Sequence, residues 1–111
     1  MTDNDTALDF VERQIEMLEL AVQRLWERLR AVPQDRYACK SAINELEDQL
    51  EVLRSRRNAL IASSLTIAGP TSQERSDLAR AAAELEALNT QQATIAAILG
   101  LAARAAKGLA S

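Results

Sequence analysis

Hydrophobic residues recur at alternating intervals of three and four along three long stretches of the chain. The first stretch runs from Leu8 to Val32, the second from Cys39 to Leu60 and the third from Leu78 to Leu99. A mean spacing of 3.5 residues places these side chains along one side of a helix. The pattern predicts an all-α fold with heptad, coiled-coil-like packing, and it says little about chemistry.

Capping residues and helix breakers predict where the helices begin and end. We expect a flexible N-terminus over residues 1–6 and a single helical domain over residues 7–109. Pro33 lacks the N–H that a helix needs, and the stretch from Thr71 to Glu74 is a capping box. The predicted helices span about residues 7–32, 35–62 and 71–107.

Short connections predict that successive helices pack antiparallel. Pairing the first two helices in this way brings Leu18 opposite Leu50 and Leu25 opposite Ile43. The third helix then folds back on the second. The predicted fold is therefore an antiparallel three-helix bundle, and the rival is an open rod whose helices pair with other chains.

Two polar residues fall on the predicted seams. Arg57 lies opposite the small Ala81 in this arrangement, and we expect its charged head to reach solvent and pair with Glu12. Gln92 is expected to fix the register of the third helix.

Composition excludes most catalytic and metal chemistry. The chain has no His and a single Cys, so the commonest general base and metal ligand is missing and no intrachain disulfide can form. Cys39 is expected to be a small buried residue. Glu45, Asp48 and Glu51 are interpreted as a solvated helix face. We therefore predict no enzyme, no catalytic residues, no cofactor and no metal site.

Charge and hydropathy also bear on which partners the protein binds and where it is located. The formal net charge is −3 without a basic stripe, which argues against nucleic-acid binding. The N-terminus is acidic and no apolar run approaches the roughly 20 residues that span a bilayer, so we expect a cytoplasmic protein. Eleven Arg against two Lys suggest a GC-rich bacterial genome.

Large apolar residues remain after the predicted seams are filled. Large apolar residues that cluster on an exterior usually mark protein–protein sites. We therefore predict a partner interface, formed with a second copy in a homo-oligomer, with another protein, or with both. Its residues are Phe10, Met17, Leu20, Ile98 and Leu101. The alternative is that the bundle bends so that the third predicted helix becomes central.

The expected function is that of a non-enzymatic helical interaction module, such as a small adaptor, chaperone or assembly factor. Two alternatives stay open. One is an inhibitor or immunity-type protein that binds an effector. The other is a membrane-surface protein anchored by its C-terminal amphipathic helix, although Arg104 and Lys107 supply few cations for such contact.

Overall fold

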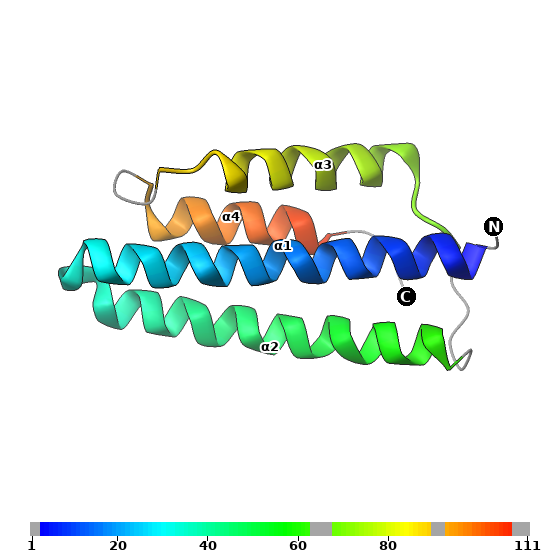
Figure 1. The fold of residues 1–111 in the computed structure, drawn as a ribbon, viewed down its shortest axis with the longest axis horizontal. Helices are drawn as coiled ribbons and strands as arrows, with labels where there is room; N and C mark the ends of the chain where they lie inside the picture. Colours follow the sequence, from blue (N-terminus) through cyan, green and yellow to red (C-terminus); the bar gives the residue numbers. More distant parts are fainter. Residues whose placement is uncertain (1–2, 63–67, 90–92, 108–111) are drawn as a thin grey trace.

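The computed structural model describes residues 3–62, 68–89 and 93–107, and these residues confirm the all-α prediction (Figure 1). They form α1 (Asp3–Ala31), the short 3-10 helix η1 (Pro33–Asp35), α2 (Arg36–Ile61), α3 (Ser72–Glu86) and α4 (Ile95–Ala106). The 29 residues of α1 span about 43 Å at 1.5 Å per residue. This helix alone therefore runs almost the whole 47 Å length of the molecule.

The first two helices form the antiparallel hairpin that the sequence predicts. Helix α1 ends at Ala31, just before Pro33, and η1 reverses the chain direction. Leu18 and Leu50 lie together in one cluster of core residues, and Leu25 and Ile43 lie together in a second. The placement of these residues agrees with the expected facing pairs.

The N-terminus is helical further toward the start of the chain than expected. Helix α1 begins at Asp3, so residues 3–6 are helical and not the flexible tail that the sequence predicts. Carboxylates near a helix N-terminus are favoured by the helix dipole. Asp5 gives the first turns of α1 that support.

The predicted capping box of the third helix is confirmed. The hydroxyl of Thr71 accepts a hydrogen bond from the backbone N–H of Glu74 at 3.1 Å. In return, the Thr71 N–H donates to the Glu74 carboxylate at 2.8 Å. Helix α3 therefore starts at Ser72, within a residue of the expected position.

The prediction of one helix over residues 71–107 is wrong, because α3 ends at Glu86 and α4 begins at Ile95. Thr94 is the N-cap of α4, with its hydroxyl accepting a hydrogen bond from the Ala97 N–H at 3.0 Å. Asn and Thr are poor helix formers and good caps. Their concentration between Asn89 and Thr94 outweighs the heptad spacing that runs across it.

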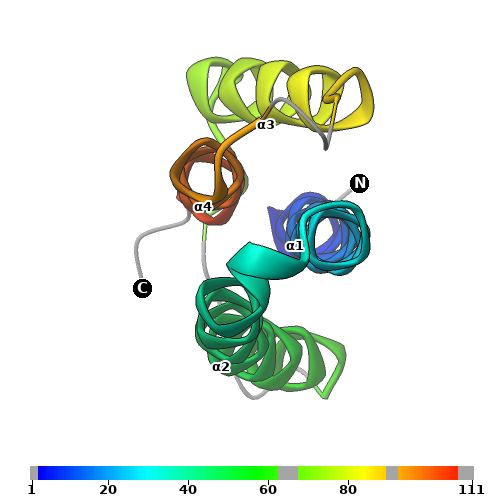
Figure 2. The same ribbon diagram turned by 90° about the vertical axis from the view of Figure 1, so that its left-hand side faces the viewer.

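The chain turns back after this break, so α4 lies between the other helices (Figure 2). It contacts α1, α2 and α3, whereas α2 and α3 make no contact with each other within the described helices. Of the predicted third helix, only the part that forms α4 contacts α2. The expected packing is wrong for α3, so Arg57 and Ala81 do not share a layer. Within the described residues, Arg57 forms no ion pair with Glu12; its Nε donates to Asn58 at 3.4 Å.

The central position of α4 changes the account of the predicted partner interface. Ile98 is fully buried, and Leu101 and Phe10 are 4% and 2% exposed. Met17 and Leu20 are half-buried and pack against the core. The premise that these five side chains lack a buried place inside the chain is wrong. The alternative, a central third helix, holds only for the C-terminal part of that helix, α4.

Arg24 and Arg28 of α1 bind the two adjoining ends of α3 and α4. Arg24 donates from Nε to the Leu85 carbonyl at 3.0 Å and from Nη2 to the Glu86 carbonyl at 3.2 Å. The last carbonyls of a helix have no partner within it. Arg24 therefore satisfies two of the terminal carbonyls of α3 and links that end of α3 to α1.

Arg28 and Gln14 act on the two ends of α4. Arg28 donates from Nη1 to the Ala93 carbonyl at 2.7 Å, and its guanidinium pairs with Asp35 at 2.9 Å. Gln14 is fully buried and donates to the Lys107 carbonyl at 3.2 Å. Both residues lie on α1, so hydrogen bonds from α1 side chains hold both ends of α4 in place.

Arg28→Ala is expected to lower the free energy of unfolding by about 1.5–3 kcal/mol, the range for a hydrogen bond to a charged group. The Arg28 side chain is only 14% exposed, so water replaces its bonds incompletely. Urea unfolding followed by circular dichroism measures the change. Arg30→Ala, on the exposed side of the same helix, should stay within about 0.5 kcal/mol of wild type. Equal losses in the two variants would show that Arg28 does not anchor α4.

Candidate functional site: a groove between α1 and α3

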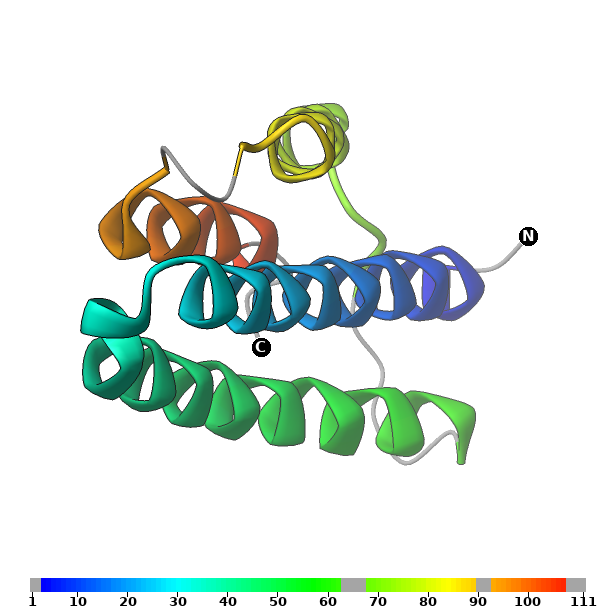
Figure 3. The same cartoon turned by 60° about the vertical axis from the view of Figure 1, so that its left-hand side comes forward.

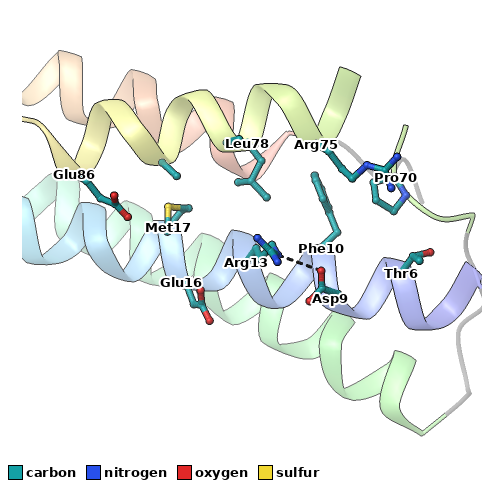
Figure 4. Close-up of a pocket in the computed structure, with 12 residues that line it drawn as sticks. Thr6, Asp9, Phe10, Arg13, Glu16, Met17, Pro70, Arg75, Leu78 and Glu86 are labelled. Carbon is teal, nitrogen blue, oxygen red and sulfur yellow. Dashed lines mark hydrogen bonds and ion pairs between the residues drawn. The ribbon is translucent and has the colours of Figure 1, made fainter. Parts of the chain in front are cut away.

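An open groove of about 570 Å³ lies between α1 and α3 (Figure 4). We call it the α1/α3 groove. Its lining comes from the first half of α1, from Pro70 just before α3, and from one face of α3. The lining residues are Thr6, Asp9, Phe10, Arg13, Glu16, Met17, Pro70, Arg75, Leu78, Ala79, Ala82 and Glu86.

The groove exists because α3 crosses α1 obliquely. Figure 3 looks nearly along α3 while α1 runs across the view. The hydrogen bonds from Arg24 hold the C-terminal end of α3 against α1. Ala79 and Ala82 stand on the face of α3 that looks into the groove, and methyl groups are too short to fill the space.

The floor of the groove is apolar and densely packed. Phe10 and Leu78 are 2% and 5% exposed and belong to the same core cluster. Met17 is half-buried against that cluster, and Ala79 is exposed above it. Because Phe10 and Leu78 are held by the core beneath them, the floor is preformed.

Charged side chains form the rim. Asp9 and Arg13 pair with each other at 3.1 Å, with their side chains 61% and 67% exposed. Glu16 and Glu86 lie at the end where α3 terminates, and Arg75 lies at the opposite end, beside Pro70 (Figure 4). The groove is therefore acidic at one end and basic at the other.

The two walls have matching periodicity. On α1 the lining residues include Thr6, Phe10, Arg13 and Met17, and on α3 they include Arg75, Ala79, Ala82 and Glu86. Each set is spaced four, three and four residues apart. This is three turns of helix, about 16 Å long. A groove walled by two helices over three turns has the dimensions of a third helix.

The described part of the chain offers the groove little chemistry of other kinds. No cluster of three or more His, Cys, Asp or Glu side chains suited to a metal lies in the described ranges. Cys39 is fully buried and does not line the groove. Burial raises the pKa of its thiol; the Asp35 carboxylate adds to the rise and Arg28 opposes it. The groove lining contains neither a thiol nor an imidazole.

The structure brings only part of the predicted interface to this site. Phe10 and Met17 line the groove, whereas Leu20, Ile98 and Leu101 pack in the second core cluster. The acidic residues of α2, Glu45, Asp48 and Glu51, are exposed. Gln92 lies outside the described residues.

Sequence reasoning missed the α3 wall of the groove. Ala79 and Ala82 were not predicted as site residues because small apolar residues give no distinct signal in a heptad pattern. The available signal was their position: they repeat with Arg75 and Glu86 along a stripe of α3 that adjoins its buried Leu78 and Leu85. A stripe of small residues flanked by charges beside the buried face leaves room for the close approach of another element.

Comparisons with known proteins found no family model, no curated protein and no solved structure that matches the chain. Among the described helices, none has both the length and the apolar character needed to cross a bilayer. Fold and site together define an all-α protein with an apolar-floored surface groove walled by two helices.

Proposed function

We propose that this protein is a non-enzymatic interaction module that binds an amphipathic helix of a partner protein in the α1/α3 groove. The observation that carries the proposal is the pair of walls with matched helical spacing over an apolar floor. Amphipathic helices commonly lay their apolar face into such a groove and are read through positions i, i+3 or i+4, and i+7.

The packing of the groove favours a large apolar side chain of the partner helix as the residue that anchors the partner in the groove. Phe10 and Leu78 close the groove from below and are almost fully buried. The accessible apolar surface above them comes from Met17, Ala79 and Ala82. A Leu, Met or Phe of the partner can enter this space without displacing the floor. Preformed surfaces bind with a smaller ordering cost.

A helix from another protein fits the groove better than one from a second copy. The apolar faces of α1, α2, α3 and α4 are already used in the core of the chain. A second copy has no free amphipathic helix among its described elements to offer. An adaptor, an assembly factor or an inhibitor would each use the groove in this way, whereas membrane anchoring requires the apolar face of α4 that the core covers.

Site-specific crosslinking tests the proposal. A photoreactive residue at position 79, on the open wall of the groove, is expected to crosslink in host cells to one segment of a partner with an amphipathic helical pattern, identified by mass spectrometry. The same residue at exposed position 103 of α4 is the matched control. Adding Ala82→Trp should abolish the crosslink from position 79, because the indole fills the groove.

Two results would count against a groove-bound helix. One is the same crosslinked proteins from positions 79 and 103, which would indicate random encounter. The other is a specific crosslink from position 79 that survives Ala82→Trp, which would place the partner outside the groove.

A further inference from the structure

We infer that the partner helix lies antiparallel to both α1 and α3, with basic residues in its first turn and acidic residues in its last turn. This inference rests on the proposed function and adds to it the direction and charge of the partner. The observations behind it are the charges at the two ends of the groove and the directions of the walls.

The charges at the ends of the groove are available to a ligand. Glu16 and Glu86 are exposed at one end and Arg75 is exposed at the other (Figure 4). Within the described ranges, none of these three side chains takes part in an ion pair. The rim charges between them, Asp9 and Arg13, neutralise each other. The field along the groove is therefore set by its ends, with a negative and a positive pole.

The directions of the walls define the direction in which a bound helix runs. Along the groove α1 runs from Thr6 to Met17 and α3 runs from Arg75 to Glu86, so the two walls point the same way (Figure 1). The N-terminus of a helix carries roughly half a positive charge and the C-terminus half a negative charge. Side chains of opposite charge already occupy both ends of α3: the Glu74 carboxylate lies at its capped start, and Arg24 donates to the carbonyls of Leu85 and Glu86 at its end. The field along the groove therefore comes from the exposed Arg75, Glu16 and Glu86 side chains. A third helix is favoured when its positive N-terminus meets the Glu16 and Glu86 end.

Helix α4 already adopts this arrangement on the other side of the same two helices. It runs opposite to α1 and α3 (Figure 1) and packs against both (Figure 2). Its packing shows that the α1–α3 pair accepts an antiparallel helix. The partner helix would repeat this geometry in the groove, with its apolar residues turned toward Ala79 and Ala82.

Two stapled helical peptides of about 14 residues provide the test. Both carry Leu at positions i, i+4 and i+7 and have the same composition. The forward peptide has two Lys in its first turn and two Glu in its last turn, and the reverse peptide exchanges them. The staple equalises helicity, which circular dichroism verifies. Fluorescence anisotropy with the full-length chain should show the forward peptide binding about fivefold more tightly, since several exposed charge pairs each contribute modestly.

Charge reversal supplies the matched comparison. The triple variant Glu16→Lys, Glu86→Lys and Arg75→Glu is expected to invert the preference. The control triple variant combines Glu47→Lys and Glu51→Lys on the exposed face of α2 with Arg80→Glu on α3, outside the groove. It makes the same change in net charge and should keep the preference of wild type.

The outcomes separate the two claims. Ala79→Trp should remove binding of both peptides, and the control Ala103→Trp should not. Equal binding of the two peptides, lost in Ala79→Trp, overturns the inferred direction and leaves the groove as a helix site. A stronger reverse peptide, or inversion by the control triple variant, also overturns the direction. Binding of neither peptide, or binding that Ala79→Trp leaves intact, overturns the proposed function itself.

Discussion

Ile98→Glu is expected to unfold most of the protein, or to lower the free energy of unfolding by about 4 kcal/mol or more. Ile98 is fully buried in the cluster that joins α4 to Ala21, Leu46 and Leu85. A carboxylate at this position would be desolvated without a partner, which belongs to the most destabilising classes of substitution. Small domains have only about 5–15 kcal/mol of stability to lose.

The single Cys offers a direct measurement of this effect. Cys39 is fully buried, and burial raises the pKa of its thiol, so a thiol reagent at neutral pH should react slowly with the folded protein. Ile98→Glu should bring the labelling rate close to that of the urea-unfolded chain. Circular dichroism should show the loss of helix in parallel.

Ala97→Glu is the matched control, one residue away on the exposed side of α4. Position 97 is the third residue of the helix after the Thr94 cap. A Glu there completes a T-x-x-E capping box, so stability should stay equal to wild type or rise by a few tenths of a kcal/mol to about 1 kcal/mol. A stable Ile98→Glu variant with unchanged thiol protection would contradict the central placement of α4.

Leu50→Ala is expected to cost about 2–5 kcal/mol, the range for truncating a fully buried Leu. Leu50 is 1% exposed and lies in the core cluster with Ile15, Leu18 and Leu53. The cost combines lost apolar burial with the cavity left between α1 and α2. It is the energetic counterpart of the hairpin that the heptad pattern predicts.

Urea unfolding monitored by circular dichroism gives the free-energy difference for Leu50→Ala. Val52→Ala, two residues further along α2 and 62% exposed, is the control and should change stability by about 0.5 kcal/mol or less. A Leu50→Ala variant as stable as the Val52→Ala control would mean that α2 does not pack on α1 through this position.

The sequence alone determined the features that depend on neighbouring residues. The apolar spacing around Leu18 and Leu50, the break before Pro33 and the capping box at Thr71 each act over a few residues. In the structure Leu18 and Leu50 are buried in one core cluster, α1 ends before Pro33, and Thr71 caps α3. Local chemistry of this kind is insensitive to how distant helices are arranged. The α1–α2 hairpin could therefore be predicted.

Tertiary structure decided what covers each apolar face. Periodicity reports that one side of a helix is buried but not which element buries it. Helix α4 is apolar on nearly all sides, so the sequence was compatible with burial against an external partner or with a central position in the chain. The Thr94 cap starts α4 as a separate helix, and this helix packs in the core. Burial of Ile98 within the chain avoids the translational entropy lost in association.

The candidate site, the α1/α3 groove, was decided by the tertiary structure. Only Phe10 and Met17 of its lining stood out in the sequence, and they were assigned to a different surface. The groove results from the oblique crossing of α3 over α1, and hydrogen bonds from Arg24 to the carbonyls of Leu85 and Glu86 hold one end of α3 on α1. Those bonds join residues about 60 positions apart. No local pattern encodes a crossing angle, because that angle is the balance of contacts made only after the helices have packed.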